Sequence, residues 1–369
     1  MTNLGFLYEN GHGVAQDYAK AREWYEKAAD KGDAVAIRNL GVLYENGRGV
    51  AQDYAKAREW YEKAADRGDA AGIRALGVLY EGGHGVAQDY AKAREWYEKA
   101  ADEDDPKAMY NLGVLYYNGY SVPHDYANAR EWFEKAADKG EAMAMYNLGV
   151  LYANGQGAAQ DYAKAREWFE RAADKGEMIA MRNLGAIYYN GYGVAQDTAK
   201  ARQWFEKAAD KGEAEAVANL EQLSIREAEA AGRYAEALQL QETRAAKREA
   251  AETNREGKPG KETAQALNGV AWYALFAREF TKALSIADRA HALLPDNLEI
   301  ETNRAHALMF LGRGEESEAL YLAHKGQRMS EQDGRLWESI IAKDFADLRK
   351  AGLTHPMMAD IEQKLGVSP

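Results

Sequence analysis

The sequence predicts an all-α solenoid of stacked helical hairpins, and three observations lead to that fold class. Six tryptophans of the 369-residue chain recur at intervals of 36 residues: Trp24, Trp60, Trp96, Trp132, Trp168 and Trp204. Six glycines keep the same interval: Gly5, Gly41, Gly77, Gly113, Gly149 and Gly185. Apolar residues within each unit follow the period of a helix and not the alternation of a strand. A constant interval without insertions means that one supersecondary unit is stacked on copies of itself.

Two helices are expected in every unit, as the second copy illustrates. The first spans about residues 34–44 and the second about residues 54–66, each with an apolar stripe. Asp53 stands at the N-cap of the second helix, and Gly68 follows its end, where a left-handed residue is favoured. Gly41 lies inside the first helix, where glycine costs about 1 kcal/mol relative to alanine. Its repetition in six copies predicts a close contact between helices that admits no side chain.

These repeated residues carry a family resemblance. The pattern Leu-Gly-x-x-Tyr-x-x-Gly-x-Gly-Val-x-x-Asp-x-x-Lys-Ala-x-x-Trp-(Tyr/Phe)-x-Lys-Ala-Ala-x-x-Gly, at a period of 36, is similar to the Sel-1-like repeat (SLR), a relative of the tetratricopeptide repeat. The resemblance covers residues 1–216 in six copies, and it implies a right-handed superhelical α/α solenoid. The fourth copy departs from the pattern, because Ser121 replaces the second loop glycine.

The type of repeat changes near the end of the sixth copy. Residues 217–331 resemble about three tetratricopeptide-like helical hairpins, with a period of 34 and a polar loop at residues 253–261. Residues 332–369 are expected to form C-terminal capping helices, because the end of a solenoid must cover its apolar face. Their apolar spacing predicts these two helices at about residues 335–350 and 357–365.

Composition and charge exclude several classes of function. The chain has no Cys, which excludes disulfides, thiolate catalysis and Cys-ligated metals. A net charge of -12 argues against general nucleic-acid binding, and there is no apolar run long enough to span a membrane. We expect no cofactor and a cytoplasmic location, with a periplasmic or secreted one if a signal peptide precedes Met1. The near-identical copies suggest recent duplication, and the resemblance implies a bacterial source, because such repeats are common in bacterial proteins.

Sequence motifs of catalysis and of metal binding are absent. The sequence contains no His-Glu-x-x-His, Gly-x-Ser-x-Gly or Ser-x-x-Lys. Residues 257–263 resemble a P-loop only faintly, since the glycine-to-lysine spacing is two residues short, and we interpret them as a flexible loop. His12 and His84 fill a loop position that varies between copies, and we interpret them as solvated. The sequence therefore predicts neither a catalytic residue nor a metal ligand.

The first helices offer the best candidate for a binding surface. In the related tetratricopeptide architecture they line a concave groove, and the shared Leu40-Gly41 pair transfers its register to positions 35, 38, 42 and 45 and their equivalents. The residues expected to contact a partner are Arg38, Val42, Glu45, Arg74, Glu81, Tyr110, Tyr117, Tyr146, Arg182 and Tyr189. The early copies present charged residues and the later ones tyrosines, and packing of each tyrosine on the neighbouring repeat is the alternative.

The resemblance implies a non-enzymatic adaptor or scaffold that holds a partner peptide or protein in this groove. The arginines would pair with carboxylates of the partner, and the tyrosines would supply apolar contacts. Four asparagines would bond to the partner backbone or pack locally: Asn39, Asn111, Asn147 and Asn183. One alternative is a structural solenoid that self-associates into a homo-oligomer. The other is a hydrolase or β-lactam-binding protein by analogy with a subset of the family, although that subset is rich in Cys and this chain has none.

Overall fold

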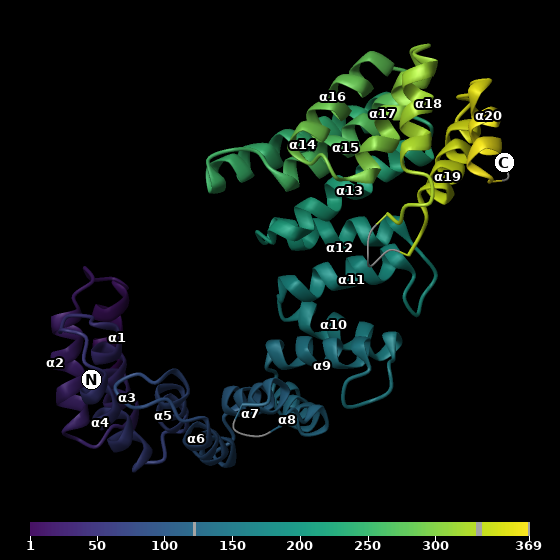
Figure 1. Ribbon diagram of the computed structural model, residues 1–369. Coiled ribbons are helices and arrows are strands. Elements are labelled where there is room, and N and C mark those ends of the chain that lie inside the picture. Colours follow the sequence, from purple (N-terminus) through teal and green to yellow (C-terminus); the bar gives the residue numbers. More distant parts are fainter. Residues whose placement is uncertain (121–122, 330–333, 368–369) are drawn as a thin grey trace. The chain divides into compact units, whose positions relative to one another are not determined.

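Helices make up the regular structure of this protein. The computed structural model describes residues 1–120, 123–329 and 334–367, and within these ranges the helices are joined by turns and one isolated β-bridge (Figure 1). The chain divides into two compact units, Met1–Ala216 and Val217–Pro369, here called unit 1 and unit 2. The predicted all-α solenoid of helical hairpins is confirmed, whereas Ser121 lies outside the described residues.

Unit 1 is a row of hairpins in which a first helix is followed by a second helix that packs against it. Each second helix also packs against the first helix of the next hairpin. The first helices are α1 (Thr2–Asn10), α3 (Ala34–Asn46), α5 (Ala70–Gly82), α7 (Pro106–Asn118), α9 (Ala142–Asn154) and α11 (Met178–Asn190). The second helices are α2 (Tyr18–Ala29), α4 (Tyr54–Ala65), α6 (Tyr90–Asp102), α8 (Tyr126–Asp138), α10 (Tyr162–Asp174) and α12 (Thr198–Asp210).

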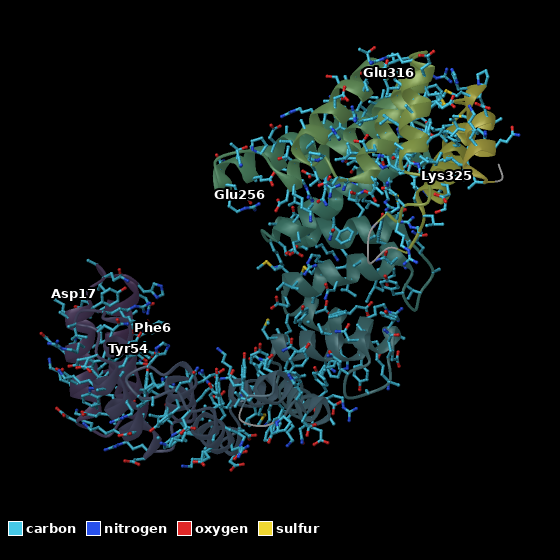
Figure 2. The ribbon with its side chains drawn as sticks, viewed as in Figure 1. Phe6, Asp17, Tyr54, Glu256, Glu316 and Lys325 are labelled. Atoms are coloured by element: carbon cyan, nitrogen blue, oxygen red, sulfur yellow. The ribbon has the colours of Figure 1, made fainter. Side chains whose placement is uncertain are left out.

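Aspartates start the second helices, as the sequence predicts. The carboxylates of Asp17 and Asp53 each accept a hydrogen bond from the backbone N–H three residues later, at 3.0 Å in both cases (Figure 2 labels Asp17). This satisfies one of the unpaired N–H groups of the first turn. At the other end of α4, Gly68 adopts a φ of 74°, which is the left-handed conformation expected of it.

The glycine inside each first helix makes room for an aromatic ring of the second helix. A Cβ atom on Gly41 would lie 2.5 Å from the ring of Tyr61, and one on Gly149 would lie 2.5 Å from the ring of Phe169. Real Cβ atoms do not approach other atoms so closely, so any other residue would push the two helices apart. The predicted contact is therefore confirmed, and the aromatic ring that occupies it is fully buried in both hairpins.

Unit 2 holds further hairpins and two terminal helices. Its helices are α13 (Ala214–Ala230, which begins at the boundary), α14 (Tyr234–Glu256), α15 (Lys261–Phe276), α16 (Phe280–Leu293), α17 (Leu298–Phe310), α18 (Gly314–Ala323), α19 (Trp337–Lys350) and α20 (Met357–Leu365). Trp337, Ile341 and Phe345 of α19 are fully buried in the core of this unit. The last helices therefore contribute apolar side chains to the same core as the hairpins.

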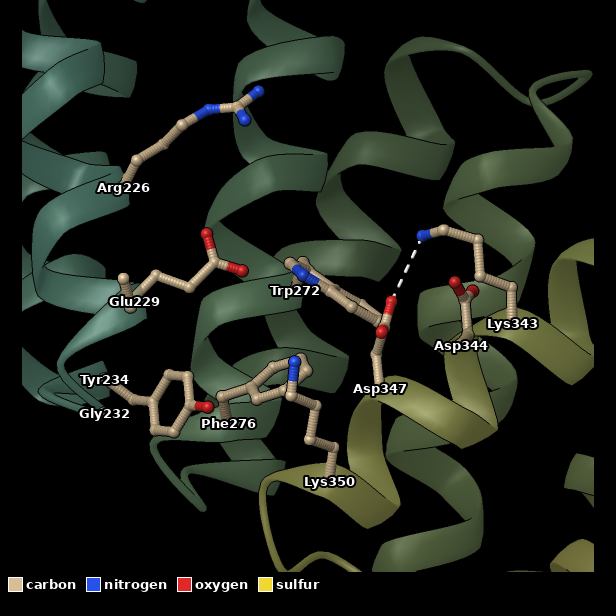
Figure 3. A pocket seen from close by; sticks show the side chains of 11 residues that line it. Arg226, Glu229, Gly232, Tyr234, Trp272, Phe276, Lys343, Asp344, Asp347 and Lys350 are labelled. Atoms are coloured by element: carbon tan, nitrogen blue, oxygen red, sulfur yellow. Dashed lines mark hydrogen bonds and ion pairs between the residues drawn. The ribbon is translucent and has the colours of Figure 1, made fainter. Parts of the chain in front are cut away.

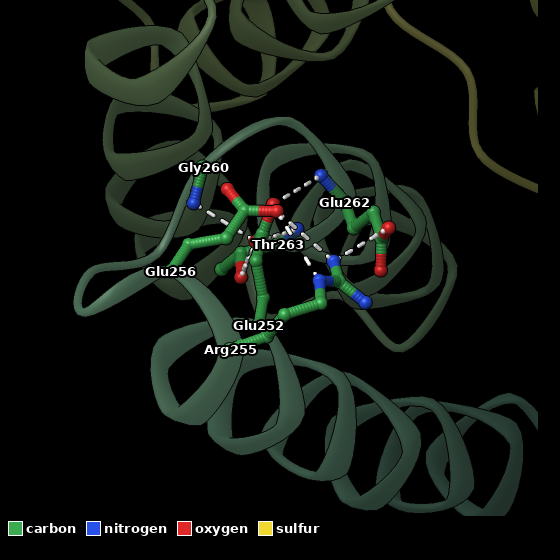
Figure 4. A network of polar contacts seen from close by, with 6 residues as sticks. All are labelled: Glu252, Arg255, Glu256, Gly260, Glu262 and Thr263. Atoms are coloured by element: carbon green, nitrogen blue, oxygen red, sulfur yellow. Dashed lines mark hydrogen bonds and ion pairs between the residues drawn. The ribbon is translucent and has the colours of Figure 1, made fainter.

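The polar loop predicted at residues 253–261 is shorter in the structure, because α14 continues to Glu256 and α15 starts at Lys261. Glu252 explains the tight connection. Its carboxylate accepts hydrogen bonds from the backbone N–H and the hydroxyl of Thr263, at 2.9 and 2.5 Å (Figure 4). The hydroxyl bond is the largest influence on this carboxylate, and it lowers the pKa of Glu252 to about 2. A charged side chain thus caps α15 from the end of α14.

Candidate functional site

The ten residues expected to contact a partner all lie on first helices of unit 1. They are half-buried, and none is fully exposed. We call the side of unit 1 that these positions occupy the first-helix surface. Its two halves differ in what the side chains do: α3 and α5 carry charged groups that are paired inside the chain, and α7, α9 and α11 carry mainly apolar and aromatic groups.

The arginines of this surface are already bound to carboxylates of the same chain. Arg38 lies 3.4 Å from Asp69, and Arg74 lies 3.1 Å from Asp105. Each carboxylate belongs to the residue that caps the first helix of the next repeat. Arg182 lies 3.5 Å from Glu213 in the same way. These contacts join repeats two, three and six to the segment that follows each of them. The sequence interpretation assigns the same arginines to carboxylates of a partner.

The glutamates of the charged half are also engaged. Glu45 accepts a hydrogen bond from the hydroxyl of Tyr61, and Glu81 accepts one from the hydroxyl of Tyr97. Burial is the main cause that raises the pKa of Tyr61 far above its usual value, and the neighbouring Glu45 raises it further. Each tyrosine therefore stays protonated and fixes its glutamate. Val42, on the same face, is half-buried against this cluster.

The apolar half lacks both partners of that hydrogen bond. Where repeats two and three have a buried tyrosine, the fourth to sixth repeats have a buried phenylalanine: Phe133, Phe169 and Phe205. Where they have glutamate, the later repeats have Tyr117, Ala153 and Tyr189. The two positions change together inside one chain, because a phenylalanine offers no hydroxyl to a buried carboxylate.

The tyrosines of the apolar half pack in part within unit 1. The ring centroids of Tyr110 and Phe133 are 5.8 Å apart, and those of Tyr117 and Tyr126 are 5.3 Å apart in an edge-to-face contact. Tyr189 is half-buried as well. Tyr110 and Tyr117 thus make the packing contacts that the sequence left open as the alternative, although neither is fully covered.

A hollow of about 360 Å³ opens between α9 and α11. Tyr146, Val150 and Ala153 line one side of it, and Asn183, Ala186 and Ile187 line the other. Asn154, Tyr162, Phe169 and Tyr192 also line it. Ala153 lines this hollow at the position where the repeats on either side carry a tyrosine.

Aromatic rings give the hollow its walls. Tyr162 and Tyr192 are stacked with centroids 4.9 Å apart, and Tyr146 lies against Phe169 at 5.9 Å. Of the predicted contact residues, Tyr146 lines the hollow and Asn183 faces it from the next repeat. The sequence interpretation did not include Tyr162, because it belongs to a second helix. The sequence does contain a tyrosine 30 positions later, Tyr192, in the loop of the next repeat, and in the structure the two rings stack.

Unit 2 has a larger hollow, of about 670 Å³, between α13, α15 and α19 (Figure 3). Tyr234, Phe276 and Trp272 form an aromatic wall, with consecutive centroids 5.0 and 4.8 Å apart. Each carboxylate that lines it has a partner: Glu229 accepts a hydrogen bond from Tyr273, Asp344 contacts the buried His306, and Asp347 pairs with Lys343. Its acidic groups therefore serve the internal packing of unit 2.

Other kinds of site find little support in the described part of the chain. Residues 1–120, 123–329 and 334–367 contain no group of three or more His, Asp or Glu side chains placed to hold a metal ion. Across the same ranges, no helix combines the length and the apolar character needed to cross a membrane. His84 is exposed, but its ring stacks on Tyr54 of the preceding repeat with centroids 5.0 Å apart, so it also joins two repeats.

Comparison with known proteins identifies the repeat. The family model described as the Sel1 repeat matches six segments: residues 1–33, 34–69, 70–105, 106–141, 142–177 and 179–213. The six copies predicted from the period of 36 are therefore confirmed. No curated protein matches the chain.

Two solved structures are similar to the chain. A Sel1 repeat protein from Oxalobacter formigenes is 37% identical over 57% of this chain and 86% of its own, with a TM-score of 0.54. The protein c5321, a protective antigen present in uropathogenic Escherichia coli strains and displaying an SLR fold, is 27% identical over 99% of this chain and 82% of its own, with a TM-score of 0.64. The second match extends over both units.

Proposed function

Because the chain belongs to the Sel1 repeat family, whose solenoid fold is commonly a scaffold for protein interactions, we propose that it is a non-enzymatic scaffold that binds a partner polypeptide on the first-helix surface of unit 1. The hollow between α9 and α11 is the centre of the proposed site. A partner would place one apolar side chain there and lie along the neighbouring first helices.

The observation that carries this proposal is the gap left by Ala153. Elsewhere on the first-helix surface the equivalent position is filled by a glutamate or a tyrosine that packs within unit 1. At Ala153 an aromatic-walled space of about 360 Å³ stays open, which is within the usual size of a binding pocket. A side chain buried among rigid aromatic rings is the typical anchor of a protein interface.

The test is to fill the hollow. Short random peptides displayed on phage are selected on the intact chain, and the affinity of the enriched peptides is measured by calorimetry for wild type and for Ala153→Tyr. This substitution restores the residue found in the repeats on either side, so it should fold normally and weaken binding at least about tenfold. Ala87→Tyr, at an exposed loop position of another repeat, is the matched control. Equal affinity for Ala153→Tyr and wild type would contradict the proposed site.

A further inference from the structure

An acidic residue at the start of each first helix receives a donor from the preceding repeat in most of unit 1. The hydroxyl of Thr2 donates to Asp33 at 2.6 Å. One repeat later Arg38 pairs with Asp69, and then Arg74 pairs with Asp105. Donor and acceptor are always 31 residues apart, so the contact is a regular part of the join between repeats.

Two repeats keep the acid and lose the donor. Tyr110 and Tyr146 stand where the arginine belongs, and the corresponding acids are Glu141 and Glu177. Neither glutamate caps its own helix through its side chain, and neither has a hydrogen-bonding or ionic partner among the described residues. Both are only half-buried, so water now solvates groups that a cation binds elsewhere in the row.

The sixth repeat boundary has both a glutamate and an arginine, and this arginine also pairs with Glu215 at 2.9 Å. Glu213 is also a glutamate, but Arg182 is present 31 residues before it, at 3.5 Å. With that partner, the carboxylate of Glu213 turns in and accepts a hydrogen bond from the N–H of Ala216 at 2.6 Å. Glutamate is therefore able to fill this position fully when an arginine accompanies it.

Glu141 and Glu177, the two glutamates without a partner among the described residues, belong to the apolar half of the surface. Tyr146, which stands in place of the arginine for Glu177, also lines the hollow between α9 and α11. Tyr110, which stands in place of the arginine for Glu141, packs against Phe133 in the same half of the surface. The apolar hollow and two unpaired negative charges thus occupy the same stretch of the surface.

We propose that the partner is a basic polypeptide segment whose Arg or Lys side chains bind Glu141 and Glu177 and replace the two absent internal arginines. This inference rests on the proposed function, because the same segment would place an apolar side chain in the hollow. The partner would therefore carry two basic residues, one for each glutamate, and an apolar residue near them.

The test uses the same library of short random peptides, selected on the intact chain. The enriched peptides should contain two Arg or Lys residues and a large apolar residue. Their affinity should fall about tenfold for the double variant Glu141→Gln and Glu177→Gln, because a charged hydrogen bond is lost at each position. The binding should also weaken steeply as the salt concentration rises, since the pairs are near the surface.

A matched control is Glu131→Gln with Glu167→Gln, which removes two exposed carboxylates from the second helices of the same repeats. This pair should leave the affinity unchanged. A second variant, Tyr110→Arg, supplies the missing arginine from within the chain and leaves the hollow intact. It should pair with Glu141, keep the protein folded and weaken binding of basic peptides.

The outcomes separate the two proposals. Enriched peptides that respond to Ala153→Tyr but are neutral or acidic, or ignore the glutamate variants, would overturn the basic partner and leave the proposed site standing. Basic peptides that respond to the glutamate variants and to the control alike would show general attraction to an acidic protein, and would also overturn it. Peptides that ignore Ala153→Tyr would remove the proposed site and this inference together.

Discussion

Repeats two and three of unit 1 differ from repeats four and five mainly in where their polar groups find partners. In the earlier pair, an arginine forms an ion pair with the next repeat, and a tyrosine donates a hydrogen bond to a glutamate. These arginines and glutamates of the first helices therefore have partners within the chain. In the later pair the same backbone carries Tyr110, Tyr146 and Ala153, which leave a hollow and two glutamates without a partner among the described residues. Repeats of one length and one fold thus differ at three or four positions in whether their polar side chains are paired within the chain.

Substitution of the glycine inside the first helix gives the largest expected effect, and it compares how much this contact stabilises the two kinds of repeat. Gly41→Ala would push the ring of Tyr61 and break its bond to Glu45, while Gly149→Ala would push only Phe169. We expect a loss of about 3 kcal/mol for Gly41→Ala and of about 1–2 kcal/mol for Gly149→Ala, after the gain in helix propensity. Urea unfolding of the two variants measures the difference.

Gly68→Ala is a useful reference for these variants. Gly68 is a left-handed glycine at which an added Cβ atom would meet no other atom within 4 Å, so the substitution reports backbone strain alone. Equal losses for Gly41→Ala and Gly149→Ala would show that the tyrosine–glutamate bond adds nothing to the contact.

Exchanging the buried aromatic residues gives the next largest effect. Tyr61→Phe removes the hydroxyl that holds Glu45, which should cost about 2 kcal/mol, because a partly buried carboxylate loses a hydrogen bond. The reverse change, Phe169→Tyr, meets Ala153 where an acceptor would be needed, so we expect no gain in stability.

Combining Phe169→Tyr with Ala153→Glu would rebuild the pair of the earlier repeats. This double variant should be more stable than the sum of its parts, and thermal unfolding of the four proteins completes a double-mutant cycle. A purely additive result would contradict the account of why these positions change together.

The dependence of stability on acid pH extends the comparison to unit 2. Glu252 accepts several hydrogen bonds, whereas Glu141 and Glu177 have no hydrogen-bonding partner among the described residues. The pKa of Glu252 in the folded protein, about 2, lies below the ordinary value of 4.5. Its contribution to stability is therefore complete above about pH 4.5 and is lost as the pH falls from there towards 2. Thr263→Val removes the largest cause of the shift and should shrink this acid-dependent loss, as measured by unfolding at a series of pH values.

Thr263→Ser keeps the hydroxyl and should retain the acid dependence of wild type. If the valine and serine variants lose stability equally between pH 4.5 and 2, Glu252 is not the group responsible.

The repeat architecture was predictable because its causes are local and occur six times. The N-cap at Asp53, the left-handed Gly68 and the glycine contact at Gly41 each follow from chemistry within one hairpin, and the structure has all three. The short loop before α15 was not predictable in this way. It depends on the hydrogen bond between Glu252 and Thr263. The sequence shows only a run of polar residues there, and such a run predicts a loop.

The position of the proposed surface follows from the sequence, but the pairing of its charged side chains does not. The register taken from Leu40-Gly41 placed Tyr146 on the surface, where it lines the hollow. Arg38, however, forms an ion pair with Asp69, which is 31 residues later in the sequence. The distance between these two side chains depends on how one repeat packs against the next. A comparison of columns within the sequence would have shown part of it, since glutamate and tyrosine, 16 residues apart, disappear together after the third copy.

The smallest expected effect concerns the lysine–tryptophan contact on the second helices, which both kinds of repeat share. Lys63 lies over the ring of Trp60 at 4.3 Å, and Lys135 lies over the ring of Trp132 at 3.9 Å. Both are cation–π contacts of exposed lysines on second helices, where each contributes about 0.5 kcal/mol. Lys63→Ala and Lys135→Ala should therefore lower the unfolding midpoint by the same small amount. Unequal losses would mean that the two halves of unit 1 differ in their second helices as well, and that the contrast is not confined to the first-helix surface.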